Sequence, residues 1–202
     1  MRQVLVALAG LLLAACLAGA QKVPTPAAGE RVFAGDCSMP CWEGVTPQAS
    51  NLDDAREQWE PVYGELIMIQ REVSDEIRWD AASDPFVESG YALAYHHTPD
   101  IVHGIYVFFR EGRVTLQQLI DELGEPMFVM RYTFEEPEAC GRIGIVFREV
   151  GVLAYMPDRQ ALRLDQFVES AMVTEITSAL IEPGDSVARF EWTGEGDYCR
   201  AR

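Results

Sequence analysis

This sequence has almost no lysine and few positive charges. Its 202 residues include 16 lysines and arginines against 32 aspartates and glutamates, so the formal net charge is −16 at pH 7. Lys22 is the single lysine, and it does not follow a glycine-rich P-loop motif. Nucleic-acid binding needs basic patches that neutralise phosphates, so this composition excludes a nucleic-acid partner.

Long hydrophobic runs are equally scarce. Only residues 4–15 form a long apolar stretch, and this stretch follows Arg2 near the N-terminus. It is shorter than the roughly 20 residues that span a bilayer, and a short basic start before such a run is typical of a secretory signal peptide. We therefore expect residues 1–15 to be a signal peptide. The remaining chain is apolar enough to bury a core, since 49% of all residues are hydrophobic.

The apolar run ends in Leu13-Ala14-Ala15-Cys16, which matches the lipobox of bacterial lipoproteins. This match predicts acylation of Cys16 and a location on the extracytoplasmic side of the bacterial cell envelope, with the membrane as partner through the N-terminal lipid. Acyl chains would hold an acidic protein that anionic lipids repel. Ordinary secretion, with cleavage after Ala18-Gly19-Ala20, is the alternative. Residues 16–35 are rich in Ala, Gly and Pro, which predicts a flexible tether.

Cysteines are also few, at five. With Cys16 acylated, an even number remains in an exported chain, which predicts two disulfides among Cys37, Cys41, Cys140 and Cys199. Three pairings are open, and the spacing favours Cys37–Cys41 with Cys140–Cys199. A zinc site is the alternative, although C-x3-C without a second close pair departs from the usual ligand spacing.

Two segments of the remaining chain carry the same order of signals. Capping residues and apolar positions at helical spacing predict short helices over 51–64 and 115–124. Strand-like runs follow each helix, at 66–72, 77–80, 91–97 and 101–109, and then at 127–134, 143–148 and 152–156. This order predicts an α+β fold of two tandem helix-plus-antiparallel-sheet repeats, 36–110 and 111–202, the second with a C-terminal extension. Residues 171–181 are ambiguous, because Phe167, Val168 and Ala171 suit a helix whereas 173–177 favours a strand, and we expect a short helix running into a final strand.

Two features of the sequence resemble known protein families. One is a second predicted helix that ends in Leu-Gly-x-Pro, and the other is the stretch before the first predicted helix, Pro40-Cys41-Trp42-Glu43-Gly44-Val45-Thr46-Pro47. It resembles an uncharacterised family of bacterial exported lipoproteins with the signature P-C-W-x-G-[IV]-x-P. More distantly, the order of these elements resembles SmpA/OmlA (BamE-like) assembly lipoproteins and the tandem-repeat β-lactamase-inhibitor-protein fold. The resemblance implies a protein that binds other proteins, and it carries over no functional residues.

Catalytic motifs are missing: neither H-E-x-x-H nor G-x-S-x-G occurs. We therefore expect no catalytic residues, no cofactor and no metal. His96, His97 and His103 flank a predicted hairpin turn, where solvated histidines are favoured over a metal site. Acids at 75–84 and 135–138 are interpreted as solvated surface, with calcium sites as the alternative. An envelope polysaccharide hydrolase using two acids is the alternative function.

Aromatic residues gather in the first predicted sheet. Alternation in strand 101–109 places Tyr106 and Phe108 on one face. This strand is either covered on both sides or part of an open aromatic face ringed by acids, which would suit an envelope protein or peptide of basic character. Trp42 is interpreted as a core residue.

The expected function is a non-catalytic protein-binding or envelope-assembly module, and a purely structural surface protein is a third interpretation. The candidate partner-binding residues are Trp79, Tyr91, Tyr95, Tyr106 and Phe108.

Overall fold

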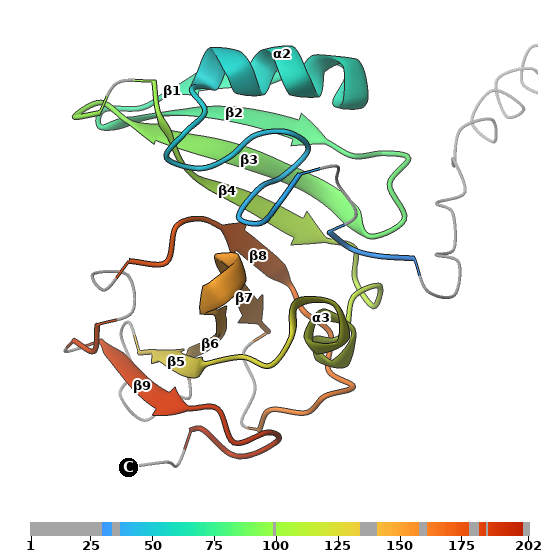
Figure 1. The fold of residues 1–202 in the computed structure, drawn as a ribbon, viewed down its shortest axis with the longest axis vertical. Helices are drawn as coiled ribbons and strands as arrows, with labels where there is room; N and C mark the ends of the chain where they lie inside the picture. Colours follow the sequence, from blue (N-terminus) through green and yellow to red (C-terminus); the bar gives the residue numbers. More distant parts are fainter. Residues whose placement is uncertain are drawn as a thin grey trace, which may run out of the picture.

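The computed structural model describes residues 30–33, 37–98, 100–133, 141–157, 161–177, 182–184 and 186–199. Within these residues, two α-helices and one 3-10 helix accompany nine strands of a single antiparallel sheet (Figure 1). The predicted α+β class is therefore confirmed.

One helix and four strands come first along the chain. Their bounds are α2 (Leu52–Tyr63), β1 (Ile67–Gln70), β2 (Ser74–Asp80), β3 (Val87–Tyr95) and β4 (Val102–Phe109). The helix begins where the sequence predicts, because the Asn51 side chain accepts a hydrogen bond from the Asp54 amide at 2.8 Å and the Asp54 carboxylate accepts one from the Asn51 amide at 2.9 Å. Gly64 ends it at a φ of 80°, which glycine adopts without a Cβ clash.

The second helix is again followed by strands. The elements are α3 (Leu116–Leu123), β5 (Phe128–Tyr132), β6 (Arg142–Phe147), the 3-10 helix η1 (Arg148–Val150), β7 (Val152–Met156), β8 (Ser170–Val173) and β9 (Val187–Glu191). The Thr115 hydroxyl caps α3 by accepting from the Gln118 amide at 3.2 Å.

The prediction of a short helix at the start of 171–181 was wrong, because residues 170–173 form the strand β8. All four of its residues are buried, and it pairs with β4 on one side and β7 on the other. A strand covered on both faces shows no polar–apolar alternation, so its sequence pattern does not separate it from a buried helix.

The strand order across the sheet is β1-β2-β3-β4-β8-β7-β6-β5-β9, and every neighbouring pair is antiparallel. The two predicted halves therefore contribute to one continuous sheet, joined where β4 pairs with β8 (Figure 1).

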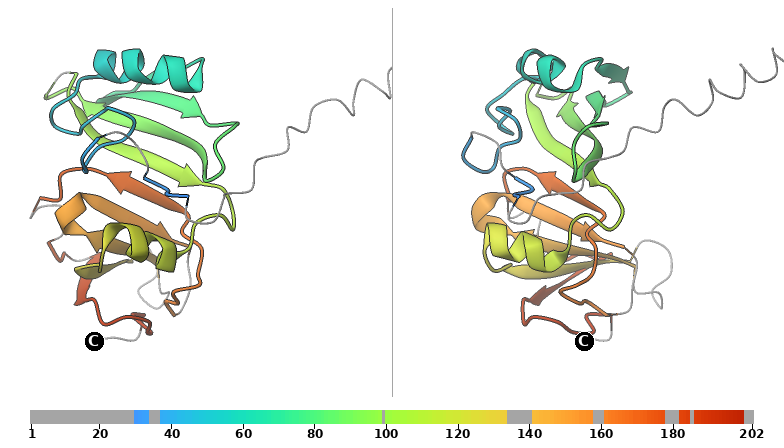
Figure 2. Two further views of the ribbon diagram at one scale, coloured as in Figure 1. Left: turned by 45° about the vertical axis from the view of Figure 1, so that its right-hand side comes forward. Right: turned by 90° about the vertical axis from the view of Figure 1, so that its right-hand side faces the viewer.

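The main core lies on one face of this sheet. Helices α2 and α3 and segment 37–50 cover that face (Figure 2). Trp59 of α2 is fully buried against Trp79 of β2, with ring centroids 4.4 Å apart. Trp42 is only 5% exposed, which agrees with its interpretation as a core residue, and its indole Nε1 donates to the Tyr63 hydroxyl at 3.0 Å. Burial of these rings stabilises the packing of α2 against the sheet.

The folded body begins earlier than the predicted tether boundary at residue 35. Val32 and Phe33 are buried at 6% and 7% exposure, and the Phe33 ring packs edge-on against Trp42 at 5.7 Å. The Glu122 carboxylate of α3 accepts hydrogen bonds from both of their backbone amides, at 2.8 and 2.7 Å. The predicted signal peptide, Cys16 and the rest of the tether lie outside the described residues.

Cys37 and Cys41 are joined by a disulfide, with Cα atoms 6.0 Å apart, so their thiols are not free to bind zinc. Cys199 is also disulfide-bonded, while Cys140, its expected partner, lies outside the described residues. Over the ranges that the structure describes, no helix has the length and apolarity to cross a membrane.

Candidate functional site

The sheet face opposite the helices carries a band of aromatic side chains. Strand pairing aligns Arg78, Tyr91 and Tyr106 across β2, β3 and β4. A second row aligns Phe108 with Ser170 and Tyr155 across β4, β8 and β7. Side chains alternate between the two faces of a strand, so further aromatic residues join this side. We call this surface the aromatic face, and its half-buried members are Tyr91, Tyr95, Tyr106, Phe108, Tyr132 and Tyr155.

Four of the five predicted partner-binding residues lie on the aromatic face, and Trp79 does not. Trp79 points toward α2 and is 2% exposed, so the prediction that it contacts a partner was wrong. The physical reason is register: Arg78 stands opposite Tyr91, and Trp79 stands opposite Gly90 with its side chain on the helix side. A single sequence shows alternation within a strand, but it does not show which face meets the helix.

The rings form two groups. Tyr91 and Tyr106 are stacked at 4.6 Å with an interplanar angle of 15°, and Phe108 lies 6.0 Å from Tyr91. In the second group, the Tyr132 and Tyr155 ring centroids are 6.1 Å apart. Burial raises the pKa of the Tyr106, Tyr132 and Tyr155 phenols, so all three stay neutral near pH 7. The face therefore combines apolar ring area with neutral hydroxyl groups.

Two arginines pack against these rings, and each is paired with a carboxylate. The guanidinium carbon of Arg78 lies 5.4 Å from the Tyr91 ring centroid, and that of Arg142 lies 4.8 Å from the Tyr155 centroid. Both distances fit cation–π contacts. Arg142 Nη2 also donates to Glu169 Oε2 at 2.7 Å, so this arginine is neutralised by a carboxylate.

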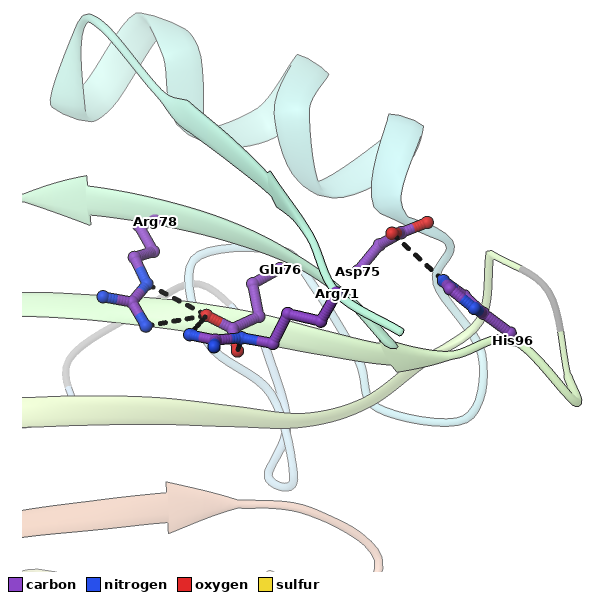
Figure 3. Close-up of polar contacts among 5 residues, drawn as sticks. All are labelled: Arg71, Asp75, Glu76, Arg78 and His96. Atoms are coloured by element: carbon purple, nitrogen blue, oxygen red, sulfur yellow. Dashed lines mark hydrogen bonds and ion pairs between the residues drawn. The ribbon is translucent and has the colours of Figure 1, made fainter. Parts of the chain in front are cut away.

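Arg71, Glu76 and Arg78 form a charged cluster (Figure 3), and it lies beside the first group of rings because Arg78 packs over Tyr91. Arg78 Nη2 lies 2.8 Å from Glu76 Oε2, and Arg71 Nη2 lies 3.3 Å from the same oxygen. Burial opposes ionisation of Glu76, but the hydrogen bonds from the two guanidinium groups outweigh it and hold the pKa of Glu76 below its usual value. Two cations share one buried carboxylate, so the cluster has one positive charge in excess.

A cavity of about 200 Å³ opens between the two groups of rings. It exists because the small side chain of Ser170 stands between Phe108 and Tyr155 in their cross-strand row. We call it the Ser170 pocket; it is lined by Tyr91, Tyr106, Phe108, Tyr132, Arg142, Tyr155 and Ser170.

The histidines extend the aromatic face at one end. The His97 and His103 rings lie 5.6 and 5.1 Å from the Tyr95 ring and 5.8 Å from each other, so the two histidines share a face as expected. His96 turns away to Asp75, with 3.2 Å between Nε2 and Oδ1 (Figure 3). Among the described residues, no group of three or more His, Cys, Asp or Glu side chains is placed to hold a metal ion. The acids at 135–138 lie outside the described residues.

A larger groove of about 640 Å³ lies at the ends of β3 and β4, where Phe167 is 46% exposed. Its acidic lining residues are Glu88, Glu111, Asp165 and Glu169. A hydrogen bond from Arg163 lowers the pKa of Asp165, whereas a general acid in a glycosidase needs a raised pKa. Glu169 is bonded to Arg142. Two of the four acids are therefore paired with arginine, and Asp165 lacks the raised pKa that a general acid needs.

Sequence reasoning missed Tyr132, Tyr155, Arg142 and Ser170. Alternation places each of them on a face of its own strand, but only the pairing of β4 with β8 brings the second half beside the first.

A comparison of the chain with protein-family models, curated proteins and solved structures finds no match. The resemblances drawn from the sequence therefore stay predictions.

Proposed function

We propose that this chain is a lipid-anchored protein on the extracytoplasmic side of the bacterial envelope that binds another protein through its aromatic face. In this proposal it is a non-catalytic binding or envelope-assembly module. The observation that carries the proposal is a set of six half-buried rings on the sheet face opposite the helices, flanked by arginines. Tyrosine and arginine are enriched among the residues that dominate binding energy in protein interfaces.

A repeated architecture supports this proposal. We propose that the chain consists of two copies of one unit, a helix followed by four antiparallel strands. The element order supports it, because β1–β4 follow α2 and β5–β8 follow α3. The strand order also supports it, because it reads β1-β2-β3-β4 up to the junction and β8-β7-β6-β5 beyond it. The aromatic face then combines rings from both copies and spans their junction.

Site-specific photo-crosslinking in the bacterial envelope tests the proposed interface. A photoreactive phenylalanine analogue replaces Tyr91 or Phe108 in the full chain, and Glu57 on the exposed side of α2 is the control position. We expect light-dependent adducts of the same mass from both face positions and none from the control. Truncating a central ring, as in Tyr106→Ala, should reduce the adduct from position 108 by about tenfold, as for a central interface residue.

Two crosslinking outcomes contradict the proposal, and one enzymatic outcome favours the alternative function. Adducts of equal yield from the face and from position 57 would show unspecific contact. Crosslinking from position 57 alone would place the interface on the helix side. Turnover of a cell-wall polysaccharide that is lost on replacing Glu88 or Glu111 in the acidic groove would favour the hydrolase instead.

A further inference from the structure

The Ser170 pocket interrupts an otherwise continuous row of rings. Ser170 is 3% exposed at the floor of the pocket, and the rings of Phe108 and Tyr155 stand on the two neighbouring strands. Where larger apolar side chains occupy β8 on this face, as at Met172, the sheet is covered and buried. The position of one small residue therefore determines where the aromatic face is hollow.

The size of the pocket limits what it accepts. The volume of the pocket is about 200 Å³. Pockets for small-molecule ligands and cofactors are usually larger, at about 300–1,000 Å³. A volume of this size fits one large side chain of a bound protein, which is the usual form of an anchor at the centre of an interface.

The arginines beside the pocket favour particular residues next to the bound side chain in the partner's sequence. Arg78 packs over Tyr91, which lines the pocket, and it shares Glu76 with Arg71. Arg71 and Arg78 remain 50% and 43% exposed, so both can reach a second carboxylate. The net charge of −16 favours a basic partner at long range, but at physiological salt charges beyond about 8 Å are screened. At contact, the excess positive charge of this cluster favours an acidic neighbour.

From this geometry we infer that the Ser170 pocket binds an aromatic side chain of a protein partner, and that an acidic residue next to it pairs with Arg78. The inference rests on the proposed function and adds the chemistry of the partner. The ring of the partner fills the gap over Ser170 between Phe108 and Tyr155. The carboxylate of the acidic residue next to that ring replaces water at the exposed guanidinium groups beside Glu76.

Three end-blocked tripeptides test this inference on the purified full chain: Glu-Phe-Glu, Lys-Phe-Lys and Glu-Ala-Glu. The chain carries 3-fluorotyrosine at its seven tyrosines, and Tyr→Phe variants assign the 19F signals. We expect Glu-Phe-Glu to shift the signals of Tyr91, Tyr106 and Tyr155 with a dissociation constant about three- to fivefold lower than that of Lys-Phe-Lys. Glu-Ala-Glu should leave these signals unchanged. Tyr63 and Tyr198 pack in the core on the other face and serve as internal controls.

Variants of the pocket and of the arginine separate the two parts of the inference. Ser170→Leu fills the pocket and should abolish the shifts, whereas Ser170→Ala should bind Glu-Phe-Glu like the parent chain. If Ser170→Leu does not fold, Phe108→Ala widens the same pocket and should weaken binding at least threefold, because one aromatic wall of the pocket is lost. Arg78→Gln should remove the preference for Glu-Phe-Glu over Lys-Phe-Lys.

The inference is overturned if Ser170→Leu binds as well as the parent chain, if Lys-Phe-Lys binds as tightly as Glu-Phe-Glu, or if neither phenylalanine peptide shifts the signals. If an oligosaccharide of N-acetylglucosamine shifts these signals and neither phenylalanine peptide does, the ligand of the pocket is a sugar ring and not an aromatic side chain. If crosslinks from Tyr91 and Phe108 persist in any of these cases, the proposed protein-binding function stands and only the anchor is wrong.

Discussion

Gly90 of β3 lies directly against the indole of Trp79 in β2. A β-carbon at Gly90 would stand 2.2 Å from Trp79 Cζ2 and 2.6 Å from the backbone oxygen of Tyr106. Both contacts are far shorter than van der Waals distance, and the second involves main chain that cannot rotate away. This close approach allows Trp79 to fill the space between the sheet and α2, so the glycine is a packing requirement of the first half of the sheet.

Replacing this glycine should therefore destabilise the whole body. We expect Gly90→Ala to lower the free energy of unfolding by about 2–3 kcal/mol, because overpacking forces the strand or the indole to move. Denaturant unfolding followed by tryptophan fluorescence measures the change. Gly104→Ala is the matched control on β4, because its β-carbon would meet Met172 at 3.6 Å, an ordinary contact. The control should stay within about 0.5 kcal/mol of the parent chain, and equal effects of the two variants would contradict this account.

The Glu76 cluster should make stability depend on pH. Its two arginines hold the pKa of Glu76 below the ordinary value of 4.5, so the ionised form is favoured in the folded state. Its stabilising contribution is fully present above pH 4.5 and is lost as the pH falls through the lower folded pKa. We expect Glu76→Gln to be about 1–2 kcal/mol less stable at pH 7, a value kept small because both arginines are about half exposed.

Urea unfolding of both chains between pH 7 and pH 3 measures this difference. The stability gap should be constant above pH 4.5 and should narrow below it. Glu57→Gln, at an exposed position of α2, is the control and should stay within about 0.5 kcal/mol at every pH. A gap for Glu76→Gln that does not narrow in acid would show that the two arginines do not stabilise the carboxylate.

The predicted anchor has a direct chemical test. Cys16→Ala removes the thiol that would carry the lipid and leaves Ala18-Gly19-Ala20 available for ordinary cleavage. We expect the parent chain to sediment with membranes and to show the added mass of acyl chains. The variant should lack that mass and become soluble, because an acidic body is repelled by anionic lipid. Membrane residence of a processed variant without acyl mass would contradict the lipoprotein assignment.

Local signals predicted both α-helices and the strands β1 to β7, but they did not predict β9 and they gave a helix where β8 begins. The caps at Asn51 and Thr115 predicted both helix starts, because a cap is a contact between residues three positions apart. The first four strands were also predicted within a few residues. What the sequence did not show is non-local: β8 pairs with β4 on one side and with β7 on the other, and no spacing along the chain encodes its pairing with β4.

The same limit applies to the candidate site. Tyr91, Tyr95, Tyr106 and Phe108 were predicted from alternation inside two neighbouring strands, and those strands do pair. Trp79 was misplaced because the face of β2 is determined by its register with β3 and by α2. The net charge of a chain also does not reveal that arginines pack against its rings.

Glu122 joins the N-terminal segment to α3, and this contact should control how firmly residues 30–33 are held. Its side chain is 5% exposed, and its two oxygens accept the Val32 and Phe33 amides at 2.8 and 2.7 Å. The amide of Glu122→Gln offers one acceptor oxygen instead of two, so one buried N–H loses its partner. We expect local opening to become easier by about 1–2 kcal/mol, which corresponds to about 5- to 30-fold faster amide exchange.

Hydrogen exchange followed by mass spectrometry measures this at a peptide covering residues 30–33. The exposed neighbour Asp121 accepts from the Gln117 side chain at 2.8 Å and does not bond to Val32 or Phe33 in the described part of the chain, so Asp121→Asn is the control and should leave exchange unchanged. Because Phe33 packs edge-on against both Trp42 and Phe109, its release should also expose part of the core to solvent. Unchanged exchange in Glu122→Gln would mean that ring packing alone holds the segment, and Phe33→Ala would then show the faster exchange instead.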